Sequence, residues 1–225
     1  ANALPGSPRE IIELIRGAVK LEEQAAKSQI INIKKNGYDF SIGVIEIPGF
    51  YRDYSAPSWR NSNFTSVTRD VKRLINELSQ QGIDGLVIDV RGNGGGHLTE
   101  ATALTGLFIK NGPIVQFRKS TNIRRNPPQR LDDPDPVSRV FYDGPLAVLV
   151  DRFSASASEI FAGAIQDYKR GIVIGHRTFG KGTVQRLDDL SAGQIKITES
   201  KFYRVSGSST QAKGIEPDIV LPSSW

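Results

Sequence analysis

The sequence lacks cysteine altogether, and it also lacks methionine. Without cysteine, the chain can form no disulfide, no thiolate metal site and no cysteine nucleophile. Histidine occurs only twice, at His97 and His176, and neither an HExxH nor an EF-hand spacing is present. A metal site built on carboxylates alone stays possible, but we expect no metal ion.

Long apolar segments are also missing. No apolar run reaches the roughly 18–20 residues that a membrane-spanning helix needs. The chain carries no signal segment and no initial methionine, so we expect an excised or processed piece of a longer protein. The remaining composition is that of a globular domain, with 38% hydrophobic and 24% charged residues among 225.

The net charge of +5 comes from lysines and arginines that are spread along the chain. A nucleic-acid-binding surface would show a basic run with interleaved aromatic residues, and we find none. We therefore expect no nucleic-acid partner.

Short apolar runs alternate with amphipathic segments. Strands are predicted at 39–51, 85–91, 113–118, 145–150 and 171–175, with further strands after residue 182. Helices are predicted at 9–17, 64–82, 97–109 and 156–170, and an exposed loop at 119–139. This alternation predicts an α/β fold with right-handed crossovers and a sheet rich in parallel strands.

Three loops follow predicted strands of this sheet. They read "RGNGGG" (91–96), "RFSASAS" (152–158) and "HRTFGKG" (176–182). In open α/β sheets the ligand site lies at the carboxyl ends of the strands, so we expect the three loops to meet there.

The second loop holds three serines. Ser156 and Glu159 have the spacing of a capping box at the start of a helix, and capping alone would explain Ser156. A nucleophile would occupy the same place, because a strand-to-helix turn exposes a hydroxyl where free backbone N–H groups can bind an oxyanion. The pattern leaves both interpretations open, while Ser154 and Ser158 are typical of turn and first-turn residues.

A nucleophilic serine needs a base. Lys181 lies between two glycines beside Phe179, where an apolar strand begins, and loss of water there would make it a better base. Gln185 follows with an amide that could orient the lysine or the serine. A triad through His97 or His176 stays possible, and so does a surface role for Lys181.

The glycine-rich loops also invite a nucleotide-binding interpretation. Gly175, Gly180 and Lys181 have P-loop spacing, but Gly182 stands where the serine or threonine should follow, and the next segment favours a strand. The glycines of 91–96 could bind phosphate or bring N–H groups close to a substrate carbonyl. Asp89 and Arg91 could pair and brace this loop, or form a surface ion pair.

Taken together, the loops resemble the tail-specific proteases, also called C-terminal processing peptidases, which are Ser-Lys enzymes. The resemblance covers roughly residues 20–221 and is carried by "VIDVRGNGGGHLTEA", "VDRFSASASEIFAGAIQDY", "GHRTFGKGTVQ" and "KFYRVSGSSTQAKGIEPDI". It implies a crotonase/ClpP-like α/β core. Residues 9–17 resemble only the last helix of the PDZ domain that such proteases carry, so residues 1–19 would be its remnant and residues 20–225 the protease core.

The resemblance also assigns roles. Ser156 would be the nucleophile, Lys181 the general base and Gln185 the residue that positions the lysine. The oxyanion hole would come from the backbone N–H of Ala157 and of a glycine, with Gly95 and Gly96 as the candidates.

The implied function is a serine endopeptidase that cleaves proteins near their C-terminus through an acyl-enzyme. Its partners would be proteins or peptides with apolar C-termini, and the full-length enzyme could associate with the inner membrane or with an adaptor protein. No cofactor, metal or nucleotide is implied, and the location would be the bacterial periplasm. Because the PDZ portion is missing, a catalytically silent module that binds peptide C-termini is the main alternative, and a phosphate-binding protein is a weaker one.

Overall fold

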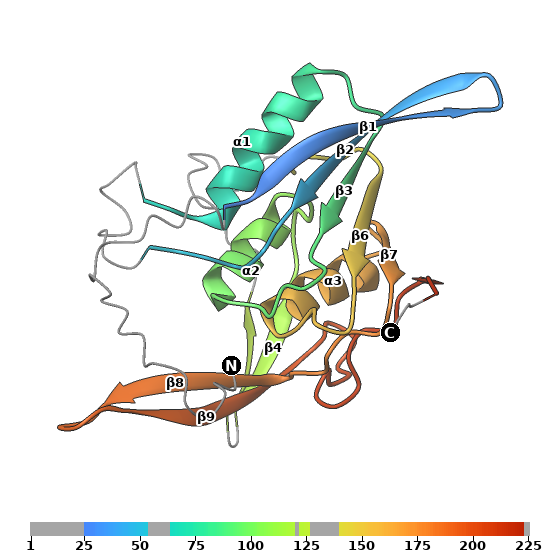
Figure 1. Ribbon diagram of the computed structural model, residues 1–225. Coiled ribbons are helices and arrows are strands. Elements are labelled where there is room, and N and C mark those ends of the chain that lie inside the picture. Colours follow the sequence, from blue (N-terminus) through green and yellow to red (C-terminus); the bar gives the residue numbers. More distant parts are fainter. Residues whose placement is uncertain (1–24, 54–63, 120–121, 127–139, 223–225) are drawn as a thin grey trace, which may run out of the picture.

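The computed structural model describes residues 25–53, 64–119, 122–126 and 140–222, and it arranges them in two sheets and three helices (Figure 1). The predicted helix at 9–17 and the expected PDZ remnant at 1–19 lie outside these residues. The helices are α1 (Val67–Gln80), α2 (Leu98–Gly106) and α3 (Ala157–Asp167). No helix in the described ranges has the length and apolar character needed to cross a membrane.

The larger sheet has the strand order β1-β2-β3-β6-β7-β10. Its strands are β1 (Lys27–Lys35), β2 (Tyr38–Glu46), β3 (Gly85–Asp89), β6 (Leu146–Val150), β7 (Ile172–Gly175) and β10 (Ile219–Val220). The pairs from β2 to β10 are parallel, whereas β1 and β2 form an antiparallel hairpin. The predicted α/β fold with a parallel-rich sheet is therefore confirmed.

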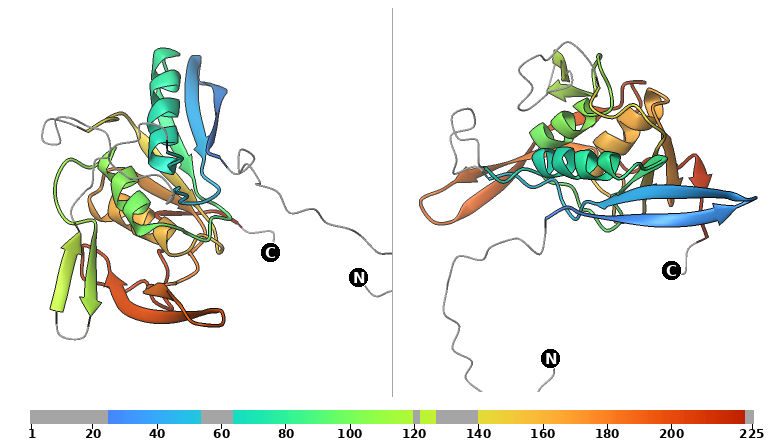
Figure 2. Two further views of the ribbon diagram at one scale, coloured as in Figure 1. Left: turned by 90° about the vertical axis from the view of Figure 1, so that its left-hand side faces the viewer. Right: turned by 90° about the horizontal axis from the view of Figure 1, so that it is seen from above.

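The three helices lie on one face of this sheet (Figure 2). The burial of the residues of β6 alternates accordingly, because successive side chains point to opposite faces. Ile45, Ile88, Val148 and Val173 have register positions in one row and are completely buried. The parallel strands thus form the core together with the helices, and their carboxyl ends are held in one fixed row.

The smaller sheet has the order β5-β4-β9-β8 and is antiparallel throughout. Its strands are β4 (Val115–Lys119), β5 (Asn122–Asn126), β8 (Thr183–Asp189) and β9 (Gln194–Tyr203). The predicted loop at 119–139 is wrong where β5 forms. The sequence of β5 is polar and does not indicate a strand, but pairing with β4 supplies hydrogen-bond partners for its backbone. The rest of that loop, from 127 to 139, lies outside the described residues.

Helix α1 shows how well periodicity predicts the core. Its apolar residues recur at helical spacing, and the buried ones are Val67, Val71, Leu74, Ile75 and Leu78, with the polar Thr68 buried beside them. Ser66 is the N-cap and accepts the backbone N–H of Arg69 at 3.5 Å. The helix predicted at 64–82 is therefore confirmed, with its first turn beginning a few residues later.

Candidate active site

The glycine-rich loop after β3 is held by one buried asparagine. The side chain of Asn93 donates to the carbonyl of Ile47 at 2.8 Å and accepts the backbone N–H of Gly95 at 2.9 Å. Asp89 and Arg91 form the predicted pair, with Nη2 of the arginine 2.6 Å from a carboxylate oxygen. The backbone of this loop is therefore fixed by the buried Asn93 within it and by the ion pair of Arg91 at its start.

Two of the three serines tie the next loop to this one. The Ser154 hydroxyl donates to the carbonyl of Val90 at 2.8 Å, and the Ser158 hydroxyl donates to the carbonyl of Asn93 at 2.9 Å. Both serines are fully buried. The Ala155 N–H also donates to the Asn93 carbonyl, at 3.0 Å. Ser154 and Ser158 are thus structural, as predicted.

Ser156 differs from its two neighbours in its backbone. Its φ of 58° and ψ of −109° lie outside the regions that a residue with a side chain prefers, and it is the N-cap of α3. Such a conformation costs on the order of 1–3 kcal/mol and persists only where the surroundings enforce it. A helix cap needs no such strain, since extended backbone serves for capping. A strained strand-to-helix turn that presents a hydroxyl is typical of a nucleophilic serine.

Glu159 enforces this turn and joins it to the loop of residues 176–182, which carries Lys181 and is called the lysine loop below. One carboxylate oxygen accepts the N–H of Ser156 at 2.8 Å and the N–H of Lys181 at 2.9 Å. The other accepts the Thr178 hydroxyl at 2.6 Å and the N–H of Gly180 at 2.7 Å. A single side chain therefore receives four hydrogen bonds and fixes the backbones of both candidate catalytic residues.

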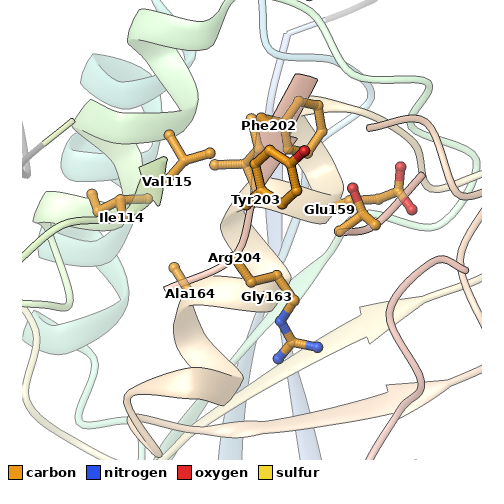
Figure 3. Close-up of a pocket in the computed structure, with 10 residues that line it drawn as sticks. Ile114, Val115, Glu159, Gly163, Ala164, Phe202, Tyr203 and Arg204 are labelled. Atoms are coloured by element: carbon orange, nitrogen blue, oxygen red, sulfur yellow. The ribbon is translucent and has the colours of Figure 1, made fainter. Parts of the chain in front are cut away.

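The surroundings of Glu159 are largely apolar. It forms one wall of a pocket whose other walls include Ile114, Val115, Phe202 and Tyr203, as Figure 3 shows. Its side chain is completely shielded from solvent. Burial raises the pKa of this carboxyl above its ordinary value, while the four hydrogen bonds act in the opposite direction and offset part of the rise.

The lysine loop is supported from behind by the segment after β9. Gly182 donates its N–H to the side chain of Gln211 at 2.7 Å, and Ala212 donates its N–H to the carbonyl of Gly180 at 2.8 Å. The N–H of Ile215 donates to the Thr178 hydroxyl at 2.7 Å. These contacts explain why "SSTQAKGI" accompanies the other three motifs, which the sequence alone did not explain. Glu159 and Gln211 are the site residues that sequence reasoning missed.

The structure brings the two loops together but does not join the two side chains. Among the hydrogen bonds of the described residues, none links the Ser156 hydroxyl to the Lys181 amine. Gln185 lies on β8 opposite Thr198 and is exposed, so its role in orienting Lys181 stays a prediction. The Nε2 atom of His176 is buried without a hydrogen-bond partner within the described ranges, so no triad through this histidine is formed.

Of the two candidate oxyanion glycines, Gly95 lies directly against the serine, whereas Gly96 lies against the backbone of Phe50. A Cβ added at Gly95 would lie 2.8 Å from the Ser156 Cβ and 3.1 Å from the backbone N of Ala157. Both glycines have positive φ, 107° for Gly95 and 143° for Gly96. The Gly95 N–H is already bound to Asn93, whereas the N–H groups of Gly96 and Ala157 donate to no group in the described part of the chain.

Comparisons with known proteins show the family to which the chain belongs. A model of Peptidase family S41 matches residues 41–221. The Tail-specific protease of Haemophilus influenzae is 44% identical over 229 aligned residues, which cover 96% of this chain. The chloroplastic C-terminal processing peptidase of Tetradesmus obliquus is 37% identical over 72% of this chain.

Comparison with solved structures also finds a C-terminal processing protease. The photosystem II D1 C-terminal processing protease matches 87% of this chain with a TM-score of 0.68 and 31% identity, and the match covers 48% of that chain. The chain therefore belongs to Peptidase family S41, and the resemblance found in the sequence is confirmed. It spans only 29% of the Haemophilus protein and 33% of the Tetradesmus protein.

Proposed function

We propose that the chain is the catalytic core of a serine endopeptidase that cleaves protein substrates near their C-terminus. The observation that carries this proposal is the strained backbone of Ser156, which one buried carboxylate holds beside the backbone of Lys181. Membership of a peptidase family and the names of the relatives support the same reaction.

In the proposed mechanism, the Ser156 hydroxyl oxygen attacks the scissile carbonyl carbon while the neutral amine of Lys181 takes the hydroxyl proton. The C–N bond then breaks, and the Lys181 ammonium gives that proton to the leaving amine. Water then attacks the ester carbonyl carbon while Lys181 takes a proton from it. The bond between that carbon and the Ser156 oxygen breaks, Lys181 returns the proton to this oxygen, and the substrate leaves with a new carboxyl group. Gln185 would orient the lysine amine when substrate is bound.

The oxyanion of each tetrahedral intermediate would lie against backbone N–H groups. Ala157 supplies the first of them from the start of α3, where the N–H groups have no partner inside the helix. The glycine loop supplies the second. Gly96 is the better candidate donor of the two, because the Gly95 N–H is bound to Asn93, while the missing side chain of Gly95 lets the Ser156 turn pack against the glycine loop.

We further propose that the substrates carry apolar C-termini and that the protein acts in the bacterial periplasm. A peripheral association with the inner membrane, or with an adaptor protein, would belong to the longer enzyme. Residues 20–225 would form the protease core, and residues 1–19 the end of a PDZ domain. The proposed chemistry needs neither a metal nor a nucleotide.

The direct test is to incubate the chain with an unfolded protein that ends in apolar residues and to identify the products by mass spectrometry. We expect cleavage by the parent chain and none by Ser156→Ala, with both proteins equally folded by circular dichroism. If both proteins bind the substrate and neither cuts it, the silent binding module replaces the protease. If a nucleotide raises the thermal stability of the parent, the phosphate-binding interpretation gains support instead.

Gly95→Ala is expected to abolish most of the hydrolysis. The new methyl group would lie 2.8 Å from both the Ala155 carbonyl oxygen and the Ser156 Cβ, at a backbone conformation that disfavours any side chain. We expect at least about a hundredfold loss of kcat/KM, comparable to the loss of one oxyanion donor. Gly94→Ala is the matched control, because a Cβ there meets no atom within 4 Å. Equal activity of the two variants would contradict the assigned geometry.

A further inference from the structure

Two phenylalanine rings are exposed in the loops that carry the candidate serine and lysine. Phe153 is 61% exposed and precedes Ser156 by three positions, and Phe179 is 65% exposed and precedes Lys181 by two. Among the exposed large apolar side chains of the described residues, only these two lie in the candidate catalytic loops. Single exposed apolar residues are ordinary, but a pair at the proposed site of peptide cleavage asks for an explanation.

The exposure of the rings does not come from loosely held backbone. The N–H of Phe153 donates to a carboxylate oxygen of Asp151 at 2.9 Å, and the same oxygen accepts the N–H of Ser154 at 3.0 Å. The N–H of Phe179 donates to the Ser154 carbonyl at 3.0 Å, and the next N–H, that of Gly180, is bound to Glu159. Hydrogen bonds therefore fix the backbone at both phenylalanines while the rings remain in water.

The same bonds place the two phenylalanines in one region. Phe179 is joined through its N–H to Ser154, which follows Phe153 directly in the chain. The Gly92 N–H also donates to Asp151, at 3.0 Å, so the glycine loop is tied to the same turn. Both rings thus belong to the connected set of loops that surrounds Ser156.

We propose that Phe153 and Phe179 bind apolar side chains of an unfolded polypeptide next to the bond that Ser156 attacks. This inference rests on the proposed function in so far as it takes a polypeptide as the ligand. Covering apolar area stabilises a complex by roughly 25 cal/mol per Å². A phenyl ring has no hydrogen-bonding group that needs a partner, so it can contact many different apolar side chains. A protease that acts on many unfolded sequences requires such contacts. The two rings would therefore select apolar over polar sequence around the cleaved bond.

The test measures binding without hydrolysis. In a Ser156→Ala background, fluorescence anisotropy gives the Kd of two labelled unstructured peptides of equal length and charge. One carries leucine and valine at several positions, and the other carries serine and asparagine there. We expect the apolar peptide to bind more tightly, and Phe153→Ala and Phe179→Ala each to raise its Kd by about fivefold to tenfold. Tyr38→Ala is the matched control, because this aromatic side chain is 71% exposed on the distant β1–β2 hairpin.

Each outcome of this experiment decides the proposal. Equal Kd values for the two peptides in the parent, or unchanged Kd values in both phenylalanine variants, would overturn it. An equal loss in Tyr38→Ala would also overturn it, since it would show general adhesion to exposed aromatic rings. Because Ser156 is already replaced, failure of the catalytic mechanism leaves this result unaffected: a chain that binds through the two rings but never cuts would lose the proposed function and keep the inference.

Discussion

Replacing Lys181 with alanine is expected to lower kcat for peptide hydrolysis by at least about a thousandfold, while KM and folding stability change little. The substitution removes the amine that would take the serine proton. It keeps the backbone N–H that donates to Glu159, because alanine supplies the same N–H. Steady-state kinetics on an unfolded protein substrate, together with thermal unfolding of each variant, would separate the chemical loss from a structural one.

Three further variants sharpen this prediction. Lys181→Arg should fail to restore activity, because a guanidinium does not give up its proton near neutral pH. Lys213→Ala removes a lysine from the same part of the molecule, beyond the catalytic loops, and should behave like the parent. His176→Ala should also keep its activity, since the Nε2 atom of this histidine has no bond to Ser156. Loss of activity in His176→Ala, with activity retained in Lys181→Ala, would make the histidine the base.

The parts of this architecture that the sequence predicts best are those that local patterns encode. The apolar runs of β3 and β6 and the helical periodicity of α1 each follow from side chains within one short window. Strand β5 was missed because its sequence is polar and its existence depends on pairing with β4, which no local pattern records. The same holds for β1, which lies outside the predicted strands and whose structure depends on its pairing with β2.

In the candidate site, too, local patterns are predictable from the sequence and contacts between distant segments are not. The spacing of Ser156 and Glu159 indicates a capping box, and Glu159 does accept the Ser156 N–H. The pattern could not show that the same carboxylate also binds Gly180 and Lys181, because that contact depends on how two separate crossovers bring their loops together. The signal available in the sequence is an acidic residue inside an otherwise apolar helical segment, since such a residue is rarely buried without several partners.

Glu159→Gln is expected to destabilise the fold by about 2–4 kcal/mol and to reduce hydrolysis by at least about a hundredfold. The amide keeps one oxygen but replaces the other with an NH₂ group, which cannot accept the N–H and hydroxyl groups that face it. Two of the four donors would then lose their acceptor inside the protein, and the turn at Ser156 would relax. Glu77→Gln is the control, because that carboxylate forms a surface ion pair with Arg73.

The pH dependence of folding gives an independent check on Glu159. Burial raises its pKa above the ordinary value, so the native state binds the proton more tightly than the unfolded chain does. The contribution of this group to stability is therefore fully present below the ordinary carboxyl pKa, and it is lost as pH rises through the higher pKa of the native state. Urea denaturation at a series of pH values should show this falling component in the parent, and Glu159→Gln should lack it. A parent component that instead rises with pH would mean that the four hydrogen bonds outweigh the effect of burial on this carboxylate, and the turn at Ser156 would then be held by a group that favours its charged form.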